Sequence, residues 1–444
     1  MFFYLYRHRK KSKRTEKKIT KAREYGTYEP VHIYPKIDYA KCIGSGACIK
    51  ACPEKDILGL SGGKGKLINA SHCIGHGACA AACPVGAITL VFGTAKRGVE
   101  IPYVTPDFET NIKGVFIVGE LGGMGLIKNA VTQGTQAVDH IACQLKEGSH
   151  KGAPSTTFHH KTPLPHKRME RKVVLGADLT DILVVGAGPA GIGASLNAFK
   201  HKLSCVIIDQ NDLGGTVLSY PRHKIVMTSP MDLPMYGKVK LRETTKEALL
   251  LLWREVFKKT GMKINSKEKM TGLKAEDGVF RVTTTKGEYM ARKVVIAIGR
   301  RGTPRKLGVP GEDLPKVTYS LLDAAQHQDH QVLVVGGGDS AVEAAIAIAD
   351  QPGNKVTLSY RGDAFSRIKP GNRERLDKAA AKKSVNVILN SNVKEITEKE
   401  ITLAVGEDST NLPNDYVYIF AGGELPNEFL KTIGIQIEKK FGTA

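Results

Sequence analysis

Short apolar runs that end in glycine-rich turns recur along the chain and predict buried β-strands. They are DILVV at residues 181–185, VLVV at 332–335 and GVFIV at 114–118. The first two lead through a glycine loop into a predicted helix. A strand, a glycine turn and a helix open a βαβ unit, so the pattern predicts an α/β fold with two Rossmann-like dinucleotide-binding domains. No apolar run approaches the roughly 20 residues that a membrane-spanning helix needs.

The first glycine loop is a complete dinucleotide-binding fingerprint. Its glycines are Gly186, Gly188 and Gly191, and the next predicted strand ends at Asp209. The glycines allow a tight turn and let a pyrophosphate approach the helix N-terminus, and an acid at this distance accepts a hydrogen bond from a ribose hydroxyl. We therefore predict that a dinucleotide binds here.

The second loop carries Gly336, Gly338 and Ser340, and it differs from the first at the end of the next predicted strand. No acid ends that strand, whereas Arg361 lies there and Arg367 is nearby. Because an arginine accommodates the 2′-phosphate of NADP, the sequence favours NADPH here, with NADH as the alternative. Two dinucleotide domains in one chain indicate a flavin reductase with FAD on the first domain.

Residues 294–311 (VVIAIGRRGTPRKLGVPG) and 334–345 (VVGGGDSAVEAA) resemble the two-domain thioredoxin-reductase-type flavoproteins. Residues 214–230 (GGTVLSYPRHKIVMTSP) resemble the bacillithiol disulfide reductase-like branch of that family. The resemblance implies FAD contacts at Gly215 and Thr216.

One further segment that resembles the family stands at a different place in this sequence than it does in the family. Residues 110–143 resemble the last FAD-binding segment of the family, which there lies at the C-terminus. Its strand ends at Gly119 and Glu120, and Glu120 replaces an aspartate that the resemblance places on the FAD ribityl chain. We interpret the order as a circular permutation.

Six of the eight cysteines fall in two copies of one pattern, CIGSGACIKACP at 42–53 and CIGHGACAAACP at 73–84. Each copy matches the bacterial C-x2-C-x2-C-x3-C-P cluster motif at three of its four cysteines. This clustering favours a metal site in a reducing cytoplasm over disulfides. Residues 37–92 therefore resemble a small α+β ferredoxin-like domain with two iron–sulfur clusters.

The second cysteine position of each copy is altered, to Ser45 in the first and His76 in the second. In such domains the fourth cysteine of one copy binds the other cluster. One predicted site is thus Cys42, Cys48 and Cys83 with Ser45, and the other is Cys73, Cys79 and Cys52 with His76. Three hypotheses remain: 4Fe-4S clusters with an oxygen or imidazole ligand, 3Fe-4S clusters, or a domain that has lost its metal.

Charge is concentrated at the N-terminus. The formal net charge is +21, and residues 1–24 hold ten Lys or Arg against two Glu. We expect either a basic tail or a segment that binds an anionic membrane surface, and no nucleic acid. The predicted divisions follow the sequence: 1–36 basic tail, 37–92 iron–sulfur domain, 93–146 displaced FAD segment, 147–172 linker, 173–302 FAD domain, 303–412 NAD(P)H domain and 413–444 return to the FAD domain.

Residues 301–412 contain no cysteine, so a C-x-x-C disulfide relay is absent from the predicted nicotinamide domain. We predict hydride transfer from NADPH to FAD, then one-electron steps through two clusters to an external electron-transfer protein or quinone. No protein nucleophile or general acid is required. The alternatives are a disulfide or low-molecular-weight thiol reductase and a non-enzymatic redox-sensing module. We expect a homodimer in the cytoplasm, with peripheral attachment to the inner face of the membrane as the alternative.

Overall fold

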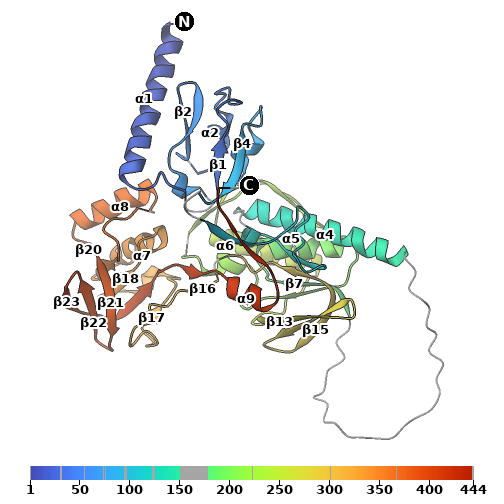
Figure 1. Cartoon of the computed structure of the whole chain (residues 1–444). Coiled ribbons are helices and arrows are strands. Elements are labelled where there is room, and N and C mark those ends of the chain that lie inside the picture. The colour runs from blue at the N-terminus through green and yellow to red at the C-terminus, as the bar shows by residue number, and fades with distance from the viewer. Residues whose placement is uncertain are drawn as a thin grey trace.

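The computed structural model consists of an N-terminal helix and three units (Figure 1). It describes residues 2–30, 33–54, 56–73, 75, 77–94, 98–122, 126–150, 179–222, 224–300, 302–366 and 368–442. We call the three units the cysteine unit (33–94), the first Rossmann unit (98–150, 179–300 and 425–442) and the second Rossmann unit (302–424). Within the described residues, no helix is both long and apolar enough to cross a membrane.

The cysteine unit is small and, in its described residues, consists of two antiparallel strand pairs and three short helices. Strand β1 pairs antiparallel with β4, and β2 pairs with β3. Its elements are β1 (Ile33–Ile37), α2 (Ala47–Ala51), β2 (Leu58–Ser61), β3 (Lys64–Leu67), η1 (Ala70–His72), α3 (Ala78–Ala81) and β4 (Ile88–Phe92). The unit therefore begins at residue 33, before the predicted boundary at 37.

Helix α1 (Phe2–Glu24) occupies much of the predicted basic tail and stands beside β2 (Figure 1). Its buried side chains Thr15, Ile19 and Ala22 recur at helical spacing, and Ile19 and Ala22 pack with Ile68 of the cysteine unit. A sufficient apolar stripe is thus present among the charges to hold a helix against the unit. The prediction of a tail over 1–36 is wrong for this part of the chain.

The first Rossmann unit is built on a sheet in which β8, β7, β15 and β6 run parallel in that order. The first half of β15 continues into an antiparallel meander with β14 and β13. The elements of this unit are β5 (Val99–Pro102), β6 (Val115–Ile117), η2 (Glu120–Gly122), α4 (Ile127–His150), β7 (Thr180–Val185), α5 (Pro189–Lys200), β8 (Cys205–Ile208), η3 (Gly215–Ser219), β9 (Ile225–Met227), β10 (Met231–Leu233), β11 (Gly237–Val239), β12 (Glu243–Thr245), α6 (Lys246–Thr260), β13 (Met270–Glu276), β14 (Val279–Thr284), β15 (Glu288–Ile296), α9 (Asn427–Thr432) and β26 (Ile437–Lys440).

The displaced segment lies inside this unit. Strand β6 is paired in register with β15, and helix α4 packs along α5. A Cβ on Gly134 of α4 would lie 2.1 Å from the carbonyl oxygen of Ala190, and one on Gly193 would lie 2.4 Å from that of Val131. The two helices are therefore in backbone contact, which only glycine permits at these positions.

The two ends of the reordered unit meet in a strand pair. Strand β26 runs antiparallel to β5, with Lys440 opposite Val99 and Ile437 opposite Pro102. A chain that ran from Lys440 through a short turn into Val99 would therefore form a β-hairpin. This geometry is compatible with the circular permutation predicted from the sequence, because a short turn would close the junction that the permutation implies.

The second Rossmann unit has a parallel sheet in the order β17-β24-β18-β19-β20, with a separate three-stranded meander. Its elements are β16 (Thr303–Pro304), β17 (Val317–Thr318), η4 (Ala324–Gln326), β18 (Gln331–Val335), α7 (Asp339–Ala349), β19 (Lys355–Ser359), α8 (Pro370–Ala381), β20 (Val385–Ile388), β21 (Ser391–Ile396), β22 (Glu400–Val405), β23 (Asp408–Pro413), β24 (Tyr416–Ile419) and β25 (Gly423–Glu424). Because β24 lies in this sheet, the chain returns to the first unit after the β16–β25 pair, later than the predicted residue 413. The predicted linker 147–172 begins within α4, and from residue 151 it lies outside the described residues.

Candidate functional site

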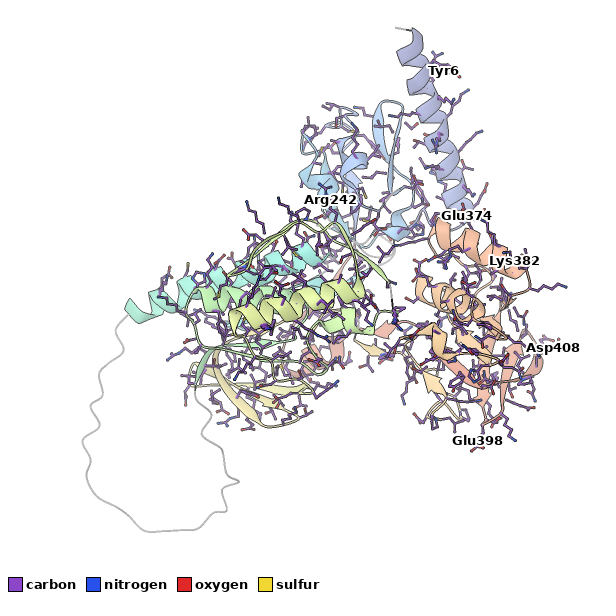
Figure 2. The ribbon with its side chains drawn as sticks, turned by 180° about the vertical axis from the view of Figure 1, so that it is seen from behind. Tyr6, Arg242, Glu374, Lys382, Glu398 and Asp408 are labelled. Carbon is purple, nitrogen blue, oxygen red and sulfur yellow. The ribbon has the colours of Figure 1, made fainter. Side chains whose placement is uncertain are left out.

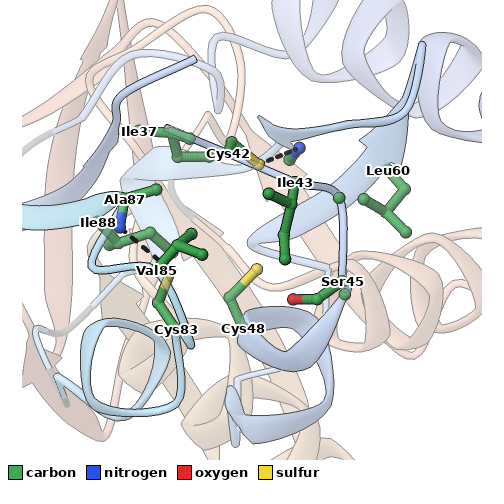
Figure 3. Close-up of a pocket in the computed structure, with 13 residues that line it drawn as sticks. Ile37, Cys42, Ile43, Ser45, Cys48, Leu60, Cys83, Val85, Ala87 and Ile88 are labelled. Atoms are coloured by element: carbon green, nitrogen blue, oxygen red, sulfur yellow. Dashed lines mark hydrogen bonds between the residues drawn. The ribbon is translucent and has the colours of Figure 1, made fainter. Parts of the chain in front are cut away.

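One predicted ligand set is brought together in the cysteine unit, and we call it site A: Cys42, Cys48, Cys83 and Ser45. All four line a cavity of about 350 Å³, including its open mouth. In Figure 3 the three sulfurs and the Ser45 hydroxyl point into this common space. The Gly65 amide donates a hydrogen bond to Cys42 Sγ at 3.3 Å, and the Ala87 amide donates to Cys83 Sγ at 3.2 Å.

The other cysteines form site B, which is Cys52, Cys73 and Cys79. Burial raises the pKa of Cys52 to about 12, and its neighbours Cys73 and Cys79 add to the rise. Burial likewise raises the pKa of Cys73 to about 11. The predicted fourth ligand, His76, lies outside the described residues.

Left-handed glycines shape both cysteine loops in the same way. Gly44 and Gly46 have φ of 70° and 71°, and the equivalent Gly75 and Gly77 have φ of 77° and 75°. A Cβ on Gly44 would also lie 2.0 Å from the carbonyl oxygen of Gly63, at the tip of the β2–β3 hairpin. The repeated glycines of the sequence thus fold the two loops alike and turn the cysteines inward.

The donor sets fit iron–sulfur clusters. Burial raises the pKa values of Cys48, Cys52, Cys73 and Cys79, so these thiols resist ionisation unless positive metal compensates their charge. Among the described residues, no three His, Cys, Asp or Glu side chains are close enough to hold a single metal ion. A cluster differs from a single ion because each thiolate binds a separate iron, so wider spacing suits it.

The first glycine loop has the geometry of a pyrophosphate cradle. Gly186 has φ of 112°, and a Cβ on Gly191 would lie 1.8 Å from the Gly186 carbonyl oxygen. Gly188 begins α5 with no side chain capping its amides, and a Cβ there would meet only Gly215, at 3.8 Å. The open space beside free helix N-terminal amides fits an anionic group.

Asp209 follows the end of β8, as the fingerprint predicts, but it also orders the loop. Its carboxylate accepts hydrogen bonds from the amides of Ala187 and Asn211, both at 2.7 Å. Burial raises the pKa of this carboxyl, although these two amides oppose the shift. Asp209 therefore stabilises the turn of the glycine loop through these two hydrogen bonds. The remaining lone pairs of its carboxylate are available to accept a hydrogen bond from a ribose hydroxyl.

The other predicted FAD residues lie around this loop. Gly215 and Thr216 begin η3, and the Gly214 amide donates to the Ala187 carbonyl at 2.9 Å. Gly119 follows β6, with its amide held by Gln133 Oε1 at 2.8 Å. Glu120 is exposed in η2 and lies near Arg300, which follows β15. The sequence did not indicate that these two residues are neighbours.

The second glycine loop differs in being covered by an aromatic ring. A Cβ on Gly337 would lie 2.1 Å from the Tyr360 ring, which stacks on Phe365 with centroids 5.3 Å apart. Gly336 has φ of 148°, and Gly338 starts α7 with open space around its Cα. Ser340 and Arg361 are exposed, in the first turn of α7 and after β19, whereas Arg367 lies outside the described residues.

Site B lies on the side of the cysteine unit that contacts the second Rossmann unit. Glu54, two residues after Cys52, forms an ion pair with Lys369 at 3.4 Å, and its side chain is only 14% exposed. Burial lowers the pKa of His72, whose ring lies near Asp339, Lys369 and the Ile368 backbone. Asp339 is itself in the first turn of α7 and accepts hydrogen bonds from Lys369 N and Asn372 Nδ2, both at 2.8 Å. Sequence reasoning missed this contact because its partners lie some 300 residues apart.

Family comparisons agree with this architecture. A model of the pyridine nucleotide-disulphide oxidoreductase family matches residues 183–443, and a 4Fe-4S dicluster domain model matches residues 34–84. The bacilliredoxin reductase of Bacillus subtilis is 29% identical over 266 residues, which are 59% of this chain and 82% of that protein. A ferredoxin–NADP reductase of Ignicoccus hospitalis is 32% identical over 271 residues, 59% and 83% of the two chains.

A solved structure extends the likeness to three dimensions. The bacillithiol disulfide reductase of Staphylococcus aureus superposes with a TM-score of 0.52 at 31% identity, covering 59% of this chain and 81% of its own. These matches confirm the predicted α/β fold, the flavoprotein class and the iron–sulfur domain. The chain belongs to the pyridine nucleotide-disulphide oxidoreductase family, as an NAD(P)H-dependent flavoprotein oxidoreductase that carries an N-terminal 4Fe-4S dicluster domain.

Proposed function

We propose that this protein takes two electrons from NADPH and delivers them one at a time, through sites B and A, to an external acceptor. The observation that carries the proposal is the contact between Glu54 and Lys369, which joins the site B side of the cysteine unit to the nucleotide-binding unit. When bound, FAD accepts a hydride and releases electrons singly, and an iron–sulfur cluster carries one electron.

The glycine loops position the two dinucleotides in this proposal. The first loop, with Asp209 and the Gly215–Thr216 turn, holds FAD by its pyrophosphate and ribose. The second loop holds NADPH, and the exposed Arg361 at the end of β19 binds its 2′-phosphate. Tyr360, packed over Gly337, holds the start of that arginine-bearing segment against the loop.

Sites A and B each hold one cluster, of the 4Fe-4S or 3Fe-4S type. Three thiolates per site suit iron because they are soft anionic ligands. At site A, the Ser45 hydroxyl faces the cavity and is the fourth ligand in the 4Fe-4S case. At site B we assign the role of fourth ligand to His76, from the repeat in the sequence.

A disulfide or low-molecular-weight thiol reductase is the second candidate, favoured by the likeness to the bacilliredoxin and bacillithiol disulfide reductases. The two cysteines outside the cluster motifs are not a C-x-x-C pair, since Cys143 lies on α4 and Cys205 on β8. Cys143 is exposed on α4, and burial raises the pKa of Cys205 on β8 to about 12, so that this thiol stays protonated and unreactive.

Anaerobic EPR after mixing with NADPH separates the two candidates. We expect the flavin absorbance to bleach and reduced-cluster signals to appear in the same sample. The proposal fails if the flavin is reduced while both clusters stay oxidised, and NADPH-dependent disulfide turnover that survives loss of the clusters would establish the thiol reductase instead. A Cys143→Ser variant checks whether that exposed thiol takes part.

A further inference from the structure

The mouth of site A is an exposed apolar patch next to the three cysteines of that site. Ile43 is 65% exposed and Val85 is 38% exposed, and both line the cavity together with Ser45. Figure 3 shows Ile43 and Val85 at the cavity alongside Cys48 and Cys83. Site B differs, because its flanks Glu54 and His72 lie against the second Rossmann unit. Site A is therefore the end of the pair that an outside molecule can reach.

The surroundings of this mouth are positive. Lys41 precedes Cys42 with 65% of its side chain exposed, Lys50 is exposed on α2, and Lys64 Nζ donates to the Cys42 carbonyl at 2.6 Å. Residues 33–94 hold six lysines and three carboxylates. All three carboxylates form ion pairs with lysines: Asp38 with Lys41, Glu54 with Lys369, and Asp56 with Lys18.

Helix α1 extends the positive surface. Ser12 Oγ accepts a hydrogen bond from the Gly62 amide at 2.8 Å, which ties the helix to the β2–β3 hairpin whose other contacts reach the Cys42 loop. The exposed side chains along this helix include Arg9, Lys10, Lys13, Arg14 and Lys17. Figure 2 shows Tyr6 near the projecting end of the helix, away from the Rossmann units.

We propose that the mouth of site A, with its lysine rim and α1, is the docking surface for a small acidic electron-carrier protein. An apolar centre inside a charged rim is the usual build of a protein interface, and opposite charge brings the partner to it quickly. Among the described apolar side chains of α1, Ile19 and Ala22 are buried against the cysteine unit, whereas Tyr6 is 60% exposed. A lipid surface is therefore the competing outcome of the binding test.

This inference rests on the proposed function and fixes its stoichiometry. NADPH gives up a hydride to become NADP⁺, and the two electrons leave singly, so two oxidised partner proteins are each reduced by one electron. The remaining proton passes to solvent, and no covalent bond to the partner forms. Such transfer needs only close approach, which the exposed Ile43 and Val85 allow.

Binding is measured with the anaerobic holoenzyme and an acidic single-cluster ferredoxin as probe, by titration calorimetry at low and high salt. We expect Lys41→Glu/Lys50→Glu and Lys13→Glu/Lys17→Glu each to weaken binding about tenfold at low salt, because rim charges govern attraction. The matched control, Lys394→Glu/Lys399→Glu, reverses two exposed lysines of the second Rossmann unit and should bind as the unchanged protein does. EPR spectra of all variants report whether the clusters are intact.

Equal binding by the mouth variants and the control, with intact clusters, would overturn the docking surface. So would retention on phosphatidylserine vesicles that depends on the same lysines while the ferredoxin does not bind, since the surface would then serve a membrane. If NADPH reduces the clusters but the probe does not bind, only this inference fails. If NADPH does not reduce the clusters, the proposed function fails with it.

Discussion

Glu54 Oε2 lies 3.4 Å from Lys369 Nζ, and this ion pair joins the loop that follows Cys52 to the segment preceding α8. Asp56, two residues further along the same loop, pairs instead with Lys18 of α1. Only the first pair crosses to a nucleotide-binding unit. A change at Glu54 therefore tests the contact of the cysteine unit with the second Rossmann unit, whereas a change at Asp56 tests its contact with α1.

Glu54→Gln should slow cluster reduction by NADPH about fivefold and leave flavin reduction unchanged. A partly exposed pair contributes about 1 kcal/mol, which sets this size. Stopped-flow absorbance at flavin and cluster wavelengths measures both rates. Asp56→Asn is the matched control and should leave both rates as they are; equal slowing in the two variants would show that the cysteine unit had merely been destabilised.

Arg361→Ala should raise the KM for NADPH about 10- to 100-fold and change that for NADH less than about twofold. A hydrogen bond to a charged group contributes about 1.5–3 kcal/mol, and only NADPH carries the 2′-phosphate. Steady-state assays with both nucleotides give the comparison, and Arg375→Ala, an exposed arginine of α8, serves as control. Equal losses with both nucleotides would remove Arg361 from the 2′-phosphate site.

Ser45→Cys should lower the potential of the site A cluster if Ser45 binds iron in a 4Fe-4S cluster, because a thiolate stabilises the oxidised state. His76→Cys should shift site B further, since it replaces a neutral ligand by an anion. If the native clusters are 3Fe-4S, both changes should instead add iron. EPR-monitored redox titration and iron analysis distinguish these cases, and no change in potential, iron or spectrum would mean that neither side chain faces the metal.

A reordered chain tests the interpretation as a circular permutation. Residues 179–442 joined by a short turn to 98–150 would place Lys440 and Val99 in one β-hairpin. We expect this chain, without the cysteine unit, to bind one FAD and to be reduced by NADPH. Residues 179–442 alone should lose the flavin, because β6 and α4 complete the sheet and cover α5. A folded reordered chain that binds no flavin would contradict the interpretation.

Local motifs made much of this structure predictable from sequence. The glycines of the 186–191 loop fold as the fingerprint requires because a Cβ at Gly191 cannot coexist with the Gly186 carbonyl. The division of six cysteines into two sets follows from the motif repeat, and the structure brings Cys42, Cys48 and Cys83 to one cavity. In both cases the constraint lies within a few residues or an exact repeat.

Features set by distant contacts were not predictable in this way. Strand β24 lies between β17 and β18, a placement that its own apolar residues do not reveal. Helix α1 was concealed by its charge, since its buried side chains Thr15, Ile19 and Ala22 are few among many charged ones. The Glu54–Lys369 contact depends on how two separately folded units dock, which no local pattern encodes.

Anaerobic titration with NADPH tests the central claim most directly, because it counts the electrons that one chain accepts. A chain with FAD and two clusters should take up about two equivalents of NADPH, as flavin holds two electrons and each cluster one. A Cys48→Ala/Cys79→Ala variant that keeps its flavin should take up about one. Saturation of the unaltered holoenzyme at one equivalent, with its clusters still oxidised by EPR, would contradict an electron path from NADPH to sites A and B.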